Sequence, residues 1–155
     1  MKLLIIQGNH NSGKTTLCAV LHNELVTNHG ARVVHLSKEE YANNLIPIPI
    51  NEDTPDFCSV LEVKGKRIAI ISQGDEGSYV KKQMDYHISK FEPDIMVVCS
   101  IIYNTEKSTI RMLLEHYRIL YNQENIVKPI WSDSPNEKAT VKKSIVLKLI
   151  KKMEL

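Results

Sequence analysis

The alternation of apolar and polar residues predicts a chain in which strands and helices follow one another. A short apolar run at Lys2–Gln7 stops at Gly8, as a strand buried on both faces would. From Lys14 the apolar residues recur every three to four positions as far as Gly30, which indicates a helix closed by a glycine. The run Ala31–Ser37 then predicts a second strand. The chain therefore opens as a βαβ unit.

The segment that follows is irregular and leads into a hairpin. Pro47, Pro49 and Pro55 exclude a long helix and a central strand from residues 38–56. Residues 58–72 consist of two β-rich runs around "KGK", which indicates a hairpin that feeds a buried strand.

The same signals predict the second half of the chain. We expect helices at 79–91 and 110–121, a buried strand at 94–100, an edge strand at 125–131 that contains Pro129, and a last helix that starts at Pro135 with Ser134 as N-cap and Glu137 in a capping box. The 155 residues suit one domain, residues 1–155. The expected fold class is α/β, with a mainly parallel sheet, helices on both faces and an inserted β-hairpin.

The composition of the chain limits the classes of function that we expect for it. The chain is 43% hydrophobic and 25% charged with a formal net charge of +2, which gives no strong nucleic-acid signal. Its three cysteines lie among apolar residues and are expected to be reduced core thiols, while the six histidines show no ligand spacing for a transition metal. No apolar run has the length of a transmembrane helix or a signal sequence, so we expect a cytoplasmic protein with no membrane partner.

The polar loop after the first strand carries the main chemical signal. Its sequence "GNHNSGKT" fits the pattern GxxxxGK[ST] and lies between a predicted strand and a predicted helix. Gly8 and Gly13 allow successive N–H groups to point at phosphate oxygens, Lys14 reaches the β and γ phosphates, and the Thr15 hydroxyl is placed to bind Mg²⁺. The expected binding residues are Gly8, Asn9, His10, Asn11, Ser12, Gly13, Lys14, Thr15 and Thr16.

This loop and its setting resemble the P-loop (Walker A) NTPase superfamily. The resemblance implies a three-layer P-loop fold and a nucleoside triphosphate bound with Mg²⁺. ATP is preferred over GTP, because Asn104–Lys107 lacks the order and the aspartate of the guanine-reading [NT]KxD motif and no DxxG switch is present.

A second element resembles the Walker B strand of that superfamily. In "RIAIISQGD" an apolar run is followed by Asp75, which we expect to act in catalysis and, with Thr15, to hold the metal ion. Asp75 stands three residues beyond Ser72, whereas the usual pattern ends the apolar run directly in Asp, and the alternative is a turn acid beside Gly74. The "SQGDEG" segment is also similar to small bacterial P-loop proteins, a resemblance that brings no substrate with it.

Likeness to the P-loop kinases of small molecules points to an acceptor side. In those kinases the acceptor docks after the second strand, where this chain carries Glu39, Glu40, Asp53 and Asp56, any of which could orient or deprotonate a hydroxyl. Lys107 and Arg111 follow the 94–100 strand, and Arg111 is expected to offset charge during transfer. A lid rich in arginine is absent, which counts against a nucleoside monophosphate kinase.

The sequence therefore predicts an ATP- and Mg²⁺-binding protein, either a kinase-like phosphotransferase for a small molecule or nucleotide, or a regulatory ATPase that acts on a protein partner. Its acceptor or partner is not defined. Further candidates are Tyr103 and Trp131 for stacking on a base, and a basic side of the last helix, formed by Lys138, Lys142, Lys143, Lys148, Lys151 and Lys152, for an anionic partner. A core or edge position is the simpler interpretation of the two aromatic residues, and a solvated surface that of the lysines.

Overall fold

The chain folds around a six-stranded sheet with the strand order β2-β3-β4-β5-β1-β6. The structure is a computed structural model, and it describes residues 1–10, 12–37, 47–50, 54–128 and 135–155. In these residues the elements are β1 (Lys2–Gln7), α1 (Lys14–His29), β2 (Arg32–Leu36), β3 (Cys58–Val63), β4 (Lys66–Ile71), α3 (Gly77–Phe91), β5 (Ile95–Ser100), α4 (Thr109–His116), the 3₁₀ turn η1 (Gln123–Asn125), β6 (Ile126–Val127) and α5 (Pro135–Met153).

The sheet is mixed but mostly parallel, as the sequence predicts. β5 pairs in parallel with β4 and β1, β1 pairs in parallel with β6, and β3 runs antiparallel to both β2 and β4. The predicted hairpin is confirmed: Lys64 and Gly65, with φ of 49° and 75°, form the two-residue turn between β3 and β4. Positive φ at both central residues matches the right-handed twist of a two-stranded ribbon.

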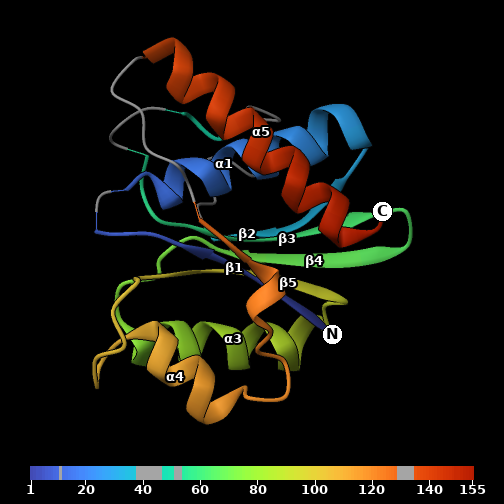
Figure 1. The fold of residues 1–155 in the computed structure, drawn as a ribbon. Coiled ribbons are helices and arrows are strands. Elements are labelled where there is room, and N and C mark those ends of the chain that lie inside the picture. Colours follow the sequence, from blue (N-terminus) through green and yellow to red (C-terminus); the bar gives the residue numbers. More distant parts are fainter. Residues whose placement is uncertain (11, 38–46, 51–53, 129–134) are drawn as a thin grey trace.

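Helices cover both faces of the sheet (Figure 1). Successive residues of a strand point to opposite faces, so β1 sends Leu4 and Ile6 into the core under α1 and α5, and Leu3 and Ile5 into the core under α3 and α4. Because both faces are covered, β5 is buried along its whole length. This explains why the central strands read as continuous apolar runs.

The carboxyl ends of β1, β4 and β5 lie at one edge of the sheet, on the left in Figure 1. β1 leads into α1 on one face, whereas its neighbour β5 leads into α4 on the other face. Adjacent strands whose connections diverge in this way create a crevice where ligands of α/β proteins bind. The backbone N–H of Gly8 donates to the carbonyl oxygen of Ser100 at this point, at 3.0 Å.

Two boundaries differ from the prediction. The helix expected at 110–121 ends at His116, because Tyr117 leaves the helical conformation with φ of −127°. Leu120 and Tyr121 then form a turn whose N–H groups donate to the carbonyl oxygen of Tyr117, and both side chains still pack on the α3 and α4 side of the core. The helical spacing of residues 117–121 thus reflects their burial on one face of the sheet. Of the edge strand expected at 125–131, the described residues contain only β6, near its start.

Other predictions can be placed directly. α5 begins at Pro135 as expected, whereas its N-cap Ser134 lies outside the described residues, as do Pro129 and Trp131. Cys18, Cys58 and Cys99 are buried free thiols. No helix in the described part of the chain has the length and apolar content that spanning a bilayer requires.

Candidate functional site

The glycine loop, residues 8–10, 12 and 13 of the described chain, joins β1 to α1 at the point where the connections of β1 and β5 diverge. Gly13 adopts the left-handed conformation, with φ of 82° and ψ of 21°, which a side chain would disfavour. Gly13 is also the N-cap of α1, and no side chain caps the helix there. A helix N-terminus of this kind presents N–H groups and a positive dipole end to an anion.

Lys14, the first residue of α1, is charged and yet almost buried, with 6% of its surface exposed. Its Nζ donates to the carbonyl oxygens of Asn9 at 2.8 Å and Gly8 at 3.2 Å, and lies 3.5 Å from Oδ1 of Asp75. A buried ammonium group is costly unless it is paired, and these oxygens provide the pairing. The side chain is therefore folded over its own loop.

Asp75 lies in a loop that is fixed from two sides. A Cβ atom at Gly74 would lie 2.3 Å from the carbonyl carbon of Cys99, so only glycine permits this approach to β5. The carbonyl oxygen of Gly74 accepts a hydrogen bond from Oγ1 of Thr109 at 2.6 Å, and the N–H of Gly77 donates to the carbonyl oxygen of Lys107 at 3.0 Å. The carboxylate of Asp75 is thereby held at the glycine loop.

The second oxygen of Asp75 contacts a histidine of the same loop. Oδ2 of Asp75 lies 2.9 Å from Nδ1 of His10. The His10 side chain is 72% exposed and that of Asp75 41%. Asp75 thus bridges Lys14 and His10, two of the residues that the sequence predicts to bind phosphate.

Thr15 contacts a different carboxylate from the one that the sequence predicts. Its hydroxyl donates to Oδ1 of Asp56 at 2.5 Å, and Oγ of Ser72 lies 3.4 Å from the same oxygen. Ser72 is fixed in turn, because its Oγ accepts from the N–H of Phe57 at 2.8 Å. Asp56 and Thr15 place a carboxylate and a hydroxyl side by side, and oxygen donors of this kind suit Mg²⁺.

Sequence reasoning considered Asp56 only for the acceptor side and missed its contact with Thr15. The signal was available in the predicted hairpin. Since β3 and β4 are antiparallel, with Cys58 opposite Ile71, the residues just before β3 must lie beside the residues just after β4. This places Asp56 at the carboxyl edge of the sheet, where a Walker B acid was sought in the residues after β4.

Two side-chain oxygens close to these residues in the sequence are buried without a hydrogen-bond partner among the described residues. They are Oγ of Ser12, in the glycine loop, and Oε1 of Gln73, beside Gly74. Buried polar atoms are rarely left unsatisfied in the absence of a functional reason. The hydroxyl of Ser12 can donate to a phosphate oxygen, whereas Oε1 of Gln73 only accepts and requires a donor.

The remaining predicted site residues are less closely connected. Arg111, on α4, is half-exposed and lies 3.7 Å from Glu115 of the same helix, and no contact joins it to the glycine loop within the described ranges. Tyr103 is 61% exposed in the loop after β5. Lys107 is exposed just before α4. Asn11, Glu39, Glu40, Asp53 and Trp131 lie outside the described residues.

Two of the buried thiols, Cys18 and Cys58, have little nucleophilic character. The hydrogen bond with Cys99, followed by burial, raises the pKa of Cys18 well above its usual value, and the two sulfur atoms lie 3.4 Å apart. Burial, together with the charge of Asp56, raises the pKa of Cys58 to about 12. Both therefore stay protonated near neutral pH, which argues against thiolate chemistry at this edge.

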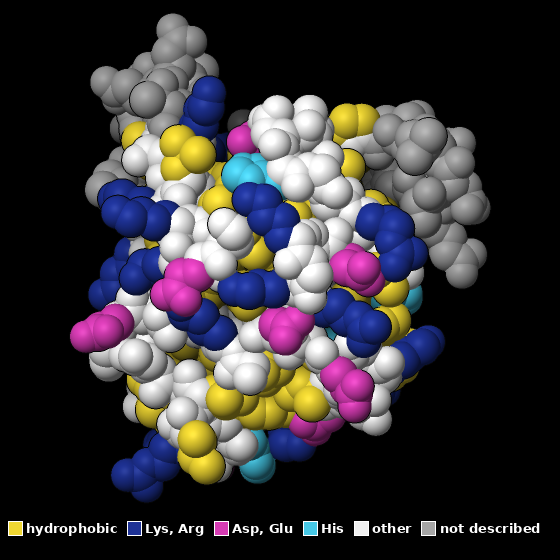
Figure 2. Space-filling model, turned by 90° about the vertical axis from the view of Figure 1, so that its right-hand side faces the viewer, with side chains coloured by type: hydrophobic (Ala, Val, Ile, Leu, Met, Phe, Trp, Pro, Cys, Tyr) yellow, Lys and Arg dark blue, Asp and Glu magenta, His cyan; other side chains and the backbone are white. Residues whose placement is uncertain are grey.

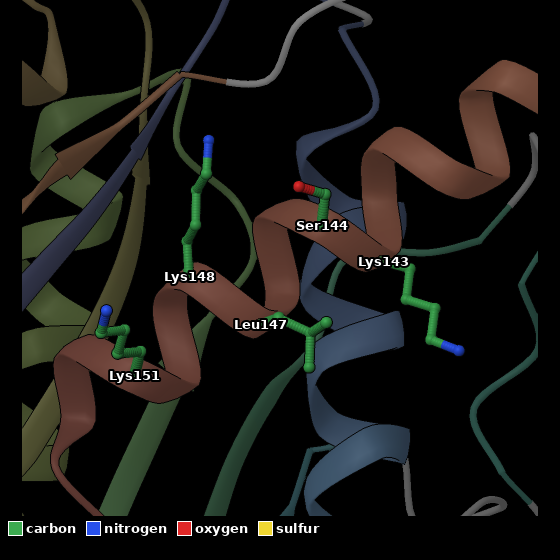
Figure 3. A pocket seen from close by; sticks show the side chains of 5 residues that line it. All are labelled: Lys143, Ser144, Leu147, Lys148 and Lys151. Carbon is green, nitrogen blue, oxygen red and sulfur yellow. The ribbon is translucent and has the colours of Figure 1, made fainter.

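The basic side of α5 forms a separate surface. Figure 3 shows Lys148 and Lys151 reaching out on one side of the helix and Lys143 on the other, with Leu147 between them; Ser144 completes the lining of this groove. Figure 2 shows the side of the molecule that carries the two termini, where Lys and Arg are interspersed with Asp, Glu and hydrophobic side chains. The charges on that side are mixed. We therefore place the candidate site at the glycine loop.

Comparison with known proteins adds nothing to this site: no family model, no curated protein and no solved structure matches the chain. The described residues contain no group of three or more His, Cys, Asp or Glu side chains that could hold a metal ion.

Proposed function

We propose that this chain is a P-loop protein that binds a nucleoside triphosphate, preferably ATP, together with Mg²⁺, and transfers the terminal phosphoryl group to a small acceptor. The observation that carries the proposal is the state of Lys14. Its ammonium group is almost buried at a helix N-terminus and is paired with two carbonyl oxygens of its own loop and with Asp75. Phosphate oxygens carry negative charge and can replace the two neutral carbonyl oxygens as acceptors.

In the proposed reaction, different residues of the chain bind the phosphates and hold the metal ion. The N–H groups at the start of α1 and the ammonium of Lys14 bind the phosphates and offset the charge that develops during transfer. Arg111, the cation that the sequence predicts for charge compensation, would have to leave Glu115 to take part. Lys14 therefore carries this role in the proposal.

Thr15 and Asp56 would hold Mg²⁺, because their oxygen atoms lie side by side next to the loop. Two protein ligands are sufficient, since Mg²⁺ usually keeps several waters and binds phosphate oxygens as well. When bound, the ion would supply neutralisation of phosphate charge. Asp75, for which the sequence predicts the metal role, contacts Lys14 and His10 instead, and we assign it to the phosphate end of the site.

The test is ATP binding in the presence of Mg²⁺, measured by calorimetry, for the wild-type protein and Lys14→Ala. Loss of charge-assisted hydrogen bonds should weaken the affinity by a factor of at least about ten. Lys81→Ala is the matched control, because Lys81 forms a surface ion pair with Asp85 on α3. Circular dichroism verifies that each variant is folded. Unchanged affinity in a folded Lys14→Ala protein would overturn the proposal, and stronger competition by GTP than by ATP would reverse the nucleotide preference.

A regulatory ATPase that acts on a protein partner is the second candidate, and one observation favours it. The loop that carries Asp75 is hydrogen-bonded to the start of α4, through Gly74 to Thr109 and through Gly77 to Lys107. A change at the phosphate end would thus reach the start of α4 and the exposed residue before it, Lys107. ADP release that needs a small acceptor supports the kinase, whereas slow release without one supports the regulatory ATPase.

A further inference from the structure

The pairing of His10 with Asp75 bears on which ring nitrogen of His10 carries its proton. Oδ2 of Asp75 lies 2.9 Å from Nδ1 of His10, and because a carboxylate oxygen and a ring lone pair repel each other at this distance, the contact favours the proton on Nδ1. In the neutral ring the lone pair is then on Nε2. Because 72% of the His10 side chain is exposed, this nitrogen is open to a group that approaches from solution.

The carboxylate that orients His10 is itself held in place. The packing of Gly74 on Cys99 and the hydrogen bond from Thr109 fix the segment that leads to Asp75. The other oxygen of Asp75 lies 3.5 Å from Nζ of Lys14, the cation that faces the phosphates in the proposed function. The imidazole of His10 is therefore next to the site of phosphoryl transfer, and it is oriented by an acid as catalytic bases commonly are.

We propose that His10, oriented by Asp75, is the general base of the transfer and that the acceptor is a neutral hydroxyl group, an alcohol or water. The inference rests on the proposed function and adds the chemical class of the acceptor. Hydroxyl groups hold their proton at neutral pH and must lose it during the transfer. Phosphates and carboxylates are already ionised and need no base. A base at this position therefore serves a hydroxyl acceptor and has no proton to remove from an anionic one.

The step balances without a further reactant. The lone pair on Nε2 of His10 takes the hydroxyl proton while the hydroxyl oxygen forms a bond to the terminal phosphorus of the nucleoside triphosphate. The bond between that phosphorus and the bridging oxygen breaks, and its electron pair leaves with the nucleoside diphosphate. The phosphate ester, or inorganic phosphate when the acceptor is water, is then released. The imidazolium returns its proton to solvent.

The experiment measures nucleotide binding and release of nucleoside diphosphate from ATP and Mg²⁺ in three arms. One arm contains no acceptor, one a pool of sugars, nucleosides and amino alcohols, and one a pool of inorganic phosphate and simple carboxylates. The proteins are the wild type, His10→Asn, His10→Gly, Asp75→Asn and His29→Asn. His29→Asn is the matched control, because it removes an imidazole paired with a carboxylate, Glu24 at 4.0 Å, at the far end of α1.

We expect release in the hydroxyl arm if the acceptor is an alcohol, or already in the acceptor-free arm if it is water. His10→Asn should lower that rate by a factor of about a hundred or more with little change in ATP affinity, and His29→Asn should not change it. Free imidazole should restore part of the rate in His10→Gly, which a purely structural role of His10 would not allow. Nitrogen NMR of the free protein should show the proton of the neutral His10 ring on Nδ1, and Asp75→Asn should reduce this preference.

Release that needs the anionic pool would overturn the inference, as would a wild-type rate in His10→Asn, a ring proton on Nε2, or ATP binding with no release in any arm. These outcomes leave the proposed nucleotide site intact. Failure of the wild-type protein to bind ATP would overturn the proposed function, and this inference with it.

Discussion

Acidification should destabilise the fold through His22, a histidine of α1 that is 4% exposed. Its Nδ1 lies 3.0 Å from Oγ of Ser59, and its ring meets Phe57 edge-on with centroids 6.0 Å apart. Burial lowers the pKa of His22 from 6.5 to about 4. The unfolded chain therefore binds a proton at a higher pH than the folded chain does, and stability falls as the pH drops from 6.5 towards 4.

The size of this effect follows from the two pKa values. At about 1.4 kcal/mol per pKa unit, the full difference amounts to about 3 kcal/mol when both states are protonated. At about pH 5 the unfolded histidine is almost fully protonated and the folded one mostly neutral, which gives a loss of about 2 kcal/mol. This is a sizeable share of the 5–15 kcal/mol, roughly, that stabilises a domain.

The assay is urea denaturation followed by circular dichroism at about pH 7 and about pH 5. The pH-dependent loss should be about 2 kcal/mol larger for the wild type than for His22→Gln, and His29→Gln should behave like the wild type. His35 and His87, whose pKa values burial also lowers, are present in all three proteins and cancel. Equal pH dependence of the wild type and His22→Gln would refute the reasoning.

Three further predictions concern the candidate site. Asp56→Asn should raise the Mg²⁺ concentration needed for ATP binding about tenfold, whereas Asp75→Asn should leave it near the wild-type value; the reverse result, in a metal titration, would restore the metal role predicted for Asp75. Gly74→Ala should weaken ATP binding, because its Cβ would lie 2.3 Å from backbone atoms of Cys99 and the loop must move. At Gly65 φ is 75° but the surrounding space is open, so Gly65→Ala should lower the free energy of unfolding by about 1 kcal/mol and leave ATP affinity unchanged. Equal losses of ATP affinity in Gly74→Ala and Gly65→Ala would contradict this prediction.

The fold was predictable where local signals agree with burial. The continuous apolar runs of β1, β4 and β5 predict strands that are covered on both faces, and helices pack on both faces of these strands. Gly30 and Pro135 mark the end of α1 and the start of α5 as predicted. The end of α4 was not predictable from spacing, because Tyr117 and Leu120 contact the core from a turn with a period close to that of a helix.

Only the part of the candidate site that lies in one continuous segment of the sequence was predictable. The glycine loop and Lys14 follow from the motif, but Asp56 reaches Thr15 through the antiparallel course of β3. Pairs between distant segments depend on strand order, which apolar periodicity does not contain. The contact of Asp75 with His10 was not predictable either. The sequence indicates each residue as a candidate, but nothing in it shows that the two lie side by side.

The parallel pairing of β1 with β5 has a consequence for biosynthesis. β1 is made well before β5, the strand that pairs with it over its whole length and runs from Ile95 to Ser100, and the N–H of Gly8 donates to the last residue of β5. Contacts between segments so far apart form late, because the intervening chain must first be ordered. A nascent chain that has not yet reached β5 carries the complete glycine loop but not the strand that supports it. The glycine loop therefore gains this support only after Ser100 has left the ribosome, and the nucleotide binding that we propose should not precede that point.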